Sequence, residues 1–194
     1  NHILLDIMEK VIKTNGPRDR RWRIEHVQHI RPEDIKRMSR LGILASVQPY
    51  HSYDDGCWAH LKLGKERIRW SYPFRTLLNQ GVKLICGSDW TVAPLNPFYG
   101  IFSAVTRRTR DGRHPYGWIP EEKISLVEAV RGYTVNPAFA EGSEDFKGTL
   151  APGKIADIIV LRQNIFRMPA DEIKNNDVIM TIFNGRIVHR QEWT

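Results

Sequence analysis

The chain has 194 residues, enough for one domain or for one domain with a small appendage. Hydrophobic residues make up 41% of it and aromatic residues 10%, which argues against a disordered chain and allows a sizeable core. The formal net charge is +7, but Lys and Arg are scattered apart from a run at 107–113. No aromatic residues are interleaved there for base stacking, so we interpret the run as a solvated helix end and expect no nucleic-acid partner.

Cysteine content and hydropathy indicate a cytoplasmic protein. Cys57 and Cys86 are too few for a disulfide framework, and Cys86 lies inside an apolar run, as in a reduced protein. No apolar run approaches the roughly 18 residues that a membrane span requires. The chain begins at Asn1 inside a helical pattern and without Met, so we expect it to be part of a longer protein.

Helices and strands alternate along the first part of the chain. Apolar residues at helical spacing predict a helix over 3–12, which Gly16 would end. The alternating segment 22–28 predicts a strand, and its residues on one face are Trp22, Ile24, His26 and Gln28. A second helix over 32–41 and a second strand over 43–47 follow.

A longer excursion precedes the third helix and strand. Residues 52–70 are mixed in character, and we expect a semi-ordered loop with short helical pieces. Extended loops after a strand often carry lids or substrate contacts. A third helix is predicted at 74–78, Gly81 would end it, and the apolar run 82–86 predicts a buried strand.

Polar side chains follow each of the three predicted strands. His26 ends the first strand, Gln48 and His51 follow the second, and Asp89 follows the third. Repeated helix–strand units call for a parallel sheet with right-handed crossovers. We therefore expect these side chains at one edge of the sheet, where ligands bind in parallel α/β folds.

The character of the chain changes after residue 146. A capping box at Ser125–Glu128 opens the last predicted helix of the first part. A strand is then predicted at 158–161 and a hairpin at 180–188, with its turn at Asn184-Gly185. We expect two units, 1–146 and 147–194, the second holding a separate small sheet.

His26 and Asp89 are the candidate pair for chemistry. A neutral imidazole and a carboxylate at neighbouring strand ends suit a divalent ion such as Zn²⁺, which lowers the pKa of a bound water toward ~7. By spacing alone, other roles stay open. A histidine at a strand end is often structural, and an aspartate there can equally cap the next helix.

Three sequence blocks resemble the amidohydrolase superfamily, in its branch amidohydrolase family 3 (YtcJ-like). They are Arg23-Ile-Glu-His-Val-Gln28, then Ala45-Ser-Val-Gln-Pro49 with His51, and Gly87-Ser-Asp-Trp90. The segment Lys147-Gly-Thr-Leu-Ala-Pro-Gly-Lys-Ile-Ala-Asp-Ile-Ile-Val-Leu161 is similar to the family as well. The resemblance runs in order along nearly the whole chain.

The resemblance implies an α/β fold, a partial TIM (β/α)₈ barrel that holds the last three strands and helices, with a small C-terminal β-sandwich portion. It implies a metal-dependent hydrolase of amide or formamide C–N bonds. His26 and Asp89 would be metal ligands, and Asp89 would also be the catalytic base. The family's other ligands would precede residue 1, so we expect weak metal binding, or none, and little turnover by this chain alone.

Other roles are weighed beside this one. Gln48, His51 and Trp90 are candidate substrate-binding residues, although Gln48 and His51 would equally suit a plain polar rim, and Trp90 could simply pack. The alternative function is a non-catalytic binding or assembly module that uses exposed sheet edges. Unpaired edges invite pairing with another chain, so we expect a homo-oligomer.

Overall fold

The computed structural model describes residues 1–192, and the last two residues of the predicted 147–194 unit lie outside this range. The first part of the chain folds as α1 (His2–Asn15), β1 (Arg23–Glu25), α2 (Pro32–Leu41), β2 (Leu44–Val47), α3 (Pro49–Asp55), α4 (Ala59–Arg67), the 3₁₀-helix η1 (Ile68–Trp70), α5 (Phe74–Asn79) and β3 (Leu84–Cys86). The second part folds as α6 (Pro97–Thr106), η2 (Pro120–Glu122), α7 (Leu126–Tyr133), α8 (Val135–Glu141), β4 (Ile158–Leu161), η3 (Ala170–Asn175), β5 (Val178–Phe183) and β6 (Arg186–Arg190).

The predicted parallel sheet is confirmed. Its strand order is β1-β2-β3, with Ile24 paired to Ala45 and Ala45 paired in turn to Leu84. All four residues of β2 and all three of β3 are buried, as expected for strands covered on both faces. Because the strands are parallel, their three carboxyl ends meet at one edge of the sheet.

Strand β1 is shorter than the alternating pattern predicts. It ends at Glu25, because His26 and Val27 adopt left-handed backbone angles, with φ of 71° and 45°. Such angles are uncommon for residues other than glycine and break the strand geometry. The side chain of His26 is therefore directed by a turn rather than by the strand alternation that was predicted.

The excursion after β2 is more ordered than the sequence indicates. It holds α3, α4 and η1, which together span most of residues 49–70. Gly64 interrupts α4 with a left-handed φ of 73°, so the helix is kinked at that point. The short helical pieces are confirmed, and the semi-ordered character is not.

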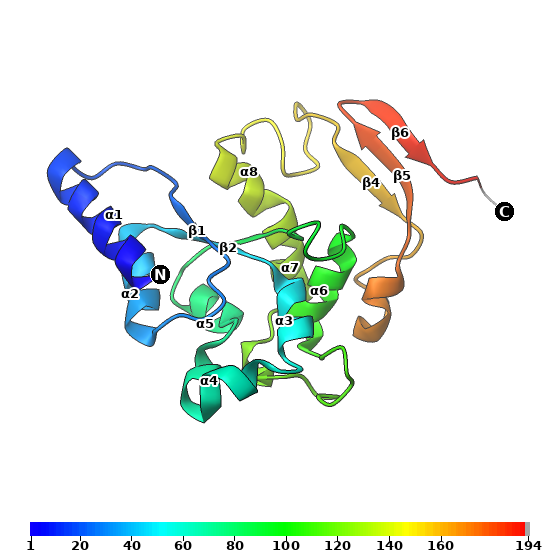
Figure 1. Ribbon diagram of the computed structural model, residues 1–194. Coiled ribbons are helices and arrows are strands. Elements are labelled where there is room, and N and C mark those ends of the chain that lie inside the picture. Colours follow the sequence, from blue (N-terminus) through cyan, green and yellow to red (C-terminus); the bar gives the residue numbers. More distant parts are fainter. Residues whose placement is uncertain (193–194) are drawn as a thin grey trace.

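The helices cover the parallel sheet and build one core with it. α7 and α8 pack against β3, α3 packs against α6, and α1 packs against α2 (Figure 1). The predicted capping box opens α7, because the Ser125 side chain accepts a hydrogen bond from the Glu128 backbone and the Glu128 side chain accepts one from the Ser125 backbone. The core side chains with 0% exposure include Leu5, Ile35, Met38, Val47 and Leu77.

Arg107 corrects our interpretation of the basic run at 107–113. Its side chain is 1% exposed, whereas the interpretation as a solvated helix end requires exposure. The residue ends α6 with a left-handed φ of 56°, which turns the side chain into the protein. Arg110 and Arg113 are exposed, so the interpretation holds for them.

The C-terminal strands form a second, antiparallel sheet in the order β4-β5-β6. The predicted hairpin is confirmed, with left-handed φ of 48° at Asn184 and 75° at Gly185 in its turn. Figure 1 shows this sheet at the opposite end of the molecule from α1. Ile165 and Ile173, which lie between β4 and β5, are nevertheless buried in the same core as the barrel helices, so the boundary at residue 147 stays a prediction. In residues 1–192, no helix is long and apolar enough to cross a membrane.

Candidate functional site

The predicted polar residues lie at the carboxyl edge of the parallel sheet. His26 follows β1 directly, and Gln48 connects β2 to α3. Pro49 occupies the first turn of α3, where its fixed φ suits a helix start, and this places His51 in that same turn. Asp89 lies three residues beyond the end of β3 with a left-handed φ of 60°.

Two histidines and the aspartate converge there. The ring centroids of His26 and His51 are 6.1 Å apart in an edge-to-face arrangement. His51 Nε2 lies 3.3 Å from Asp89 Oδ2, within the range of an ion pair. The same nitrogen is buried and makes no hydrogen bond of acceptable geometry, so the contact with Asp89 is one of proximity rather than a formed hydrogen bond. The sequence predicted both side chains at this edge of the sheet, but not their direct approach to 3.3 Å.

Gln48 presents a second buried polar atom without a partner. Its residue is 7% exposed, and its side-chain Oε1 has no hydrogen-bond partner in the described structure. Leaving such an atom unpaired costs about 1–3 kcal/mol, so native proteins keep few of them outside functional sites. His51 Nε2 and Gln48 Oε1 therefore make this edge of the sheet the candidate ligand site.

A sequence model of the protein family described as "Amidohydrolase family" matches residues 3–189 of the chain. This range includes every polar residue of the sheet edge and most of the second sheet. The chain belongs to the amidohydrolase family.

Curated relatives agree with this membership. The Arabidopsis thaliana protein LONG AFTER FAR-RED 3 is 44% identical over 84% of this chain and 28% of its own length. The putative amidohydrolase YtcJ of Bacillus subtilis is 30% identical over 97% of this chain and 35% of its own length. An N-substituted formamide deformylase of Arthrobacter pascens is 30% identical over 94% of this chain and 33% of its own length. The chain thus spans about a third of the length of these relatives.

Solved structures show the same fold. A metal-dependent hydrolase from Pyrococcus horikoshii superposes with a TM-score of 0.65 at 27% identity, over 77% of this chain and 30% of that chain. The three parallel strands with their helices, and the small C-terminal sheet, therefore form a partial α/β barrel fold of the amidohydrolase type.

The donor set at the sheet edge fits part of a metal site. Imidazole nitrogens and a carboxylate are ligands that Zn²⁺ accepts, and the unpartnered Nε2 of His51 is such a nitrogen. Within residues 1–192, however, no three His, Cys, Asp or Glu side chains are arranged to hold a metal ion. The described residues thus offer candidate ligands without a complete metal site.

The outer residues of the site are open to solvent. The Asp89 side chain is 33% exposed, and Trp90 is 66% exposed. Trp90 does not pack into the core of the described residues. Its predicted contact with substrate, like those of Gln48 and His51, stays a prediction.

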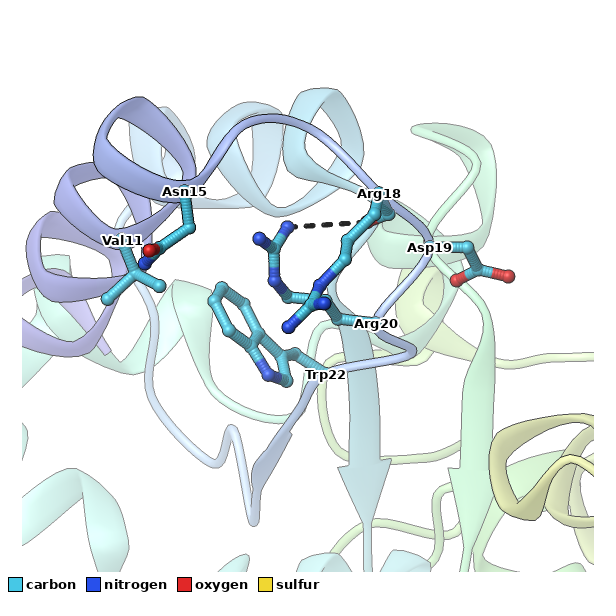
Figure 2. A pocket seen from close by; sticks show the side chains of 6 residues that line it. All are labelled: Val11, Asn15, Arg18, Asp19, Arg20 and Trp22. Carbon is cyan, nitrogen blue, oxygen red and sulfur yellow. Dashed lines mark hydrogen bonds between the residues drawn. The ribbon is translucent and has the colours of Figure 1, made fainter.

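A hollow elsewhere on the surface is unrelated to this site. It has a volume of about 440 Å³ and lies between α1 and the start of β1, at the amino end of the sheet. Figure 2 shows the Arg20 guanidinium near the Trp22 indole in this hollow, where its centre is 5.0 Å from the ring. Arg20 donates a hydrogen bond of 2.9 Å to Gly16 O, a carbonyl that follows the end of α1. Because this hollow adjoins the opposite strand ends, it does not enter the chemistry proposed below.

Proposed function

We propose that this chain is the C-terminal part of a metal-dependent amidohydrolase that hydrolyses C–N bonds of the amide or formamide type. The single observation that carries the proposal is the convergence of His26, His51 and Asp89 at one edge of a parallel sheet, in a chain of the amidohydrolase family. The name of the Arthrobacter relative, a formamide deformylase, supports this substrate class.

His26 and Asp89 are the proposed ligands of a divalent ion, which we take to be Zn²⁺. The ion, when bound, supplies a water that ionises near neutral pH. Asp89 is the proposed base: a carboxylate oxygen accepts the proton of the attacking water and then donates it to the leaving nitrogen. His51 Nε2 lies 3.3 Å from Asp89 Oδ2, close enough to restrict the positions that this carboxylate can take.

Substrate contacts are assigned to the residues around Asp89. The unpartnered Oε1 of Gln48 accepts a hydrogen bond from an N–H group of the substrate, which suits a primary or secondary amide. Trp90 offers an exposed aromatic face next to Asp89 in sequence, on which a substrate could pack. The substrate is therefore a small molecule.

We further propose that the 194-residue chain alone has little or no activity. Although His26, His51 and Asp89 lie at one edge of the sheet, no three His, Cys, Asp or Glu side chains of the described residues are arranged to hold a metal ion, and catalytic zinc sites use three protein ligands. Metal affinity decreases when ligands are missing, so the isolated chain binds zinc weakly. In a longer protein, side chains from other strands would complete the site.

The test compares zinc content and hydrolysis in a longer protein that carries this chain. We expect stoichiometric zinc in that protein, and loss of zinc in its His26→Ala and Asp89→Ala variants. The expected loss of formamide hydrolysis is on the order of 10²-fold or more for Asp89→Asn. His60→Ala, at an exposed position, serves as the matched control. Full zinc occupancy in both alanine variants would refute the ligand assignment.

A second candidate function, a non-catalytic assembly module, is favoured by the surface of the chain. β1 is an edge strand of the parallel sheet, and the apolar residues Ile3 and Ile7 of α1 are 74% and 52% exposed. Exposed edges and apolar patches favour association, here into homo-oligomers. Sedimentation of a monomer at high protein concentration would exclude this candidate.

A further inference from the structure

A buried segment, Ser71–Tyr72, connects the loop after His26 to the helix that carries His51. Ser71 is 0% exposed and Tyr72 is 1% exposed, although both lie between helices in sequence. Tyr72 adopts a left-handed φ of 52°, a conformation that costs energy for an aromatic residue and persists only when several contacts fix it. The Ser-Tyr-Pro sequence at 71–73 gives no indication of such a role.

On one side, this segment is bound to the loop that follows His26. Tyr72 N donates a hydrogen bond of 2.7 Å to Gln28 O, two residues beyond His26. His29 Nδ1 lies 2.9 Å from Ser71 Oγ, and the backbones of these two residues form an isolated antiparallel bridge. The His29 ring also packs edge-to-face on the Tyr72 ring at 6.0 Å.

On the other side, it is bound to the helix that carries His51. The hydroxyl of Tyr72 donates a hydrogen bond of 2.5 Å to Asp55 Oδ2, at the last residue of α3. Asp55 follows His51 by four residues, which places the two side chains on the same face of the helix. Burial and the neighbouring Asp55 carboxylate raise the pKa of Tyr72 well above its usual value, so the hydroxyl keeps its proton.

Arg107 holds the same segment by its backbone carbonyls. Its guanidinium donates hydrogen bonds of 3.0 Å to Tyr72 O and 3.4 Å to Ser71 O, and its Nε donates one of 3.0 Å to Trp118 O. It lies between the rings of Phe74 and Trp118, at 5.4 and 5.3 Å. The partners of this buried cation in the described structure are backbone carbonyls and ring faces.

We propose that Tyr72 is a positioning residue, which sets the separation of His26 and His51 through Gln28 O and Asp55. It touches neither the reacting atoms nor the proposed metal. The role rests on the function proposed above, because the separation matters only if both rings serve one site. A group hydrogen-bonded to a metal ligand typically changes metal affinity 10–100-fold when it is replaced, and Tyr72 lies one hydrogen bond further out, so we expect the lower end of that range.

The test uses the 194-residue chain and nuclear magnetic resonance of the ring signals of His26 and His51, assigned with His→Gln variants. Tyr72→Phe removes only the hydroxyl, and Asp55→Ala removes only its acceptor, whereas Asp55→Asn keeps an acceptor. We expect the first two variants to move the ring signals of both histidines in the same way, and Asp55→Asn to restore signals close to those of the native chain. The double variant Tyr72→Phe/Asp55→Ala should add nothing to either single one.

Ser103→Ala is the matched control. It also removes one buried hydroxyl, which donates to Tyr99 O at 2.7 Å, but it lies on α6 outside this network. It should lower thermal stability comparably and leave the histidine signals in place. A zinc titration of a longer protein that carries this chain should give an apparent Kd that Tyr72→Phe raises about tenfold.

The outcomes separate this inference from the function on which it rests. Unchanged histidine signals in Tyr72→Phe, or equal changes in Ser103→Ala, would overturn the positioning role. If zinc moves neither ring signal in a longer protein that carries this chain, while Tyr72→Phe still moves both signals in the 194-residue chain, the positioning role stands and the metal assignment fails.

Discussion

Glu128 provides the sharpest test of how the helices are held against the sheet. Its carboxylate accepts two hydrogen bonds from Arg75, of 2.8 and 2.6 Å, and also accepts the Ser125 N–H of the capping box at 2.7 Å. It thereby connects α5, which leads into β3, with α7, which packs on β3. The perturbation is Glu128→Gln, which keeps an acceptor for the capping box and removes the charge.

The magnitude follows from the pKa of this group. The hydrogen bonds from Arg75 lower the pKa of Glu128 from 4.5 to about 2, against burial, which raises it. At 1.36 kcal/mol per pKa unit, the ceiling on its contribution is about 3.4 kcal/mol. The side chain is 32% exposed, and solvent screens the pair, so we expect about 1.5–2 kcal/mol.

The pH dependence has a definite sign. The folded protein holds the carboxylate more acidic than the unfolded chain does, so the stabilisation is complete above pH ~5.5. It is lost as the pH falls from about 4.5 toward 2, where both states bind the proton. The native chain should therefore exceed Glu128→Gln in stability at neutral pH and approach it in acid.

Urea unfolding at pH 7, 5.5, 4.5 and 3.5 measures this difference, and calorimetry at pH 7 should show a Tm lower by about 3–8 °C. Glu121→Gln is the control, because that exposed carboxylate is one helical segment away, and its change should stay within about 0.5 kcal/mol. A difference between native chain and Glu128→Gln that stays constant from pH 7 to pH 3.5 would refute the assignment to this ion pair.

Two further predictions concern the packing around β3. A Cβ at Gly132 would lie 2.6 Å from Cys86 Sγ, so Gly132→Ala should destabilise the fold by about 1–3 kcal/mol in urea unfolding. Adding Cys86→Ala should recover most of that lost stability. Equal loss in the single and double variants would contradict this packing. Burial raises the pKa of the Cys86 thiol to about 12. A thiol reagent at pH 8 should therefore modify the half-buried Cys57 and leave Cys86 unmodified until urea is added. Modification of Cys86 in the native protein would contradict its burial.

Local rules explain the parts of the fold that the sequence predicted. The capping box at Ser125 and the hairpin turn at Asn184-Gly185 depend on backbone chemistry within a few residues, and both are confirmed. Hydrophobic periodicity identified the repeated helix–strand units, and their parallel arrangement follows from the short turns between them. Parallel strands, in turn, bring the segments after β1, β2 and β3 to one edge.

The tertiary structure alone decided how the side chains meet at that edge. The left-handed turn at His26 and the 3.3 Å approach of His51 to Asp89 depend on how whole elements pack. Arg107 shows the same limit: its sequence neighbours are solvated cations, yet its guanidinium is buried on the carbonyls of Ser71 and Tyr72. Such contacts join residues more than thirty positions apart, and a local pattern does not encode the partners that the rest of the fold brings near.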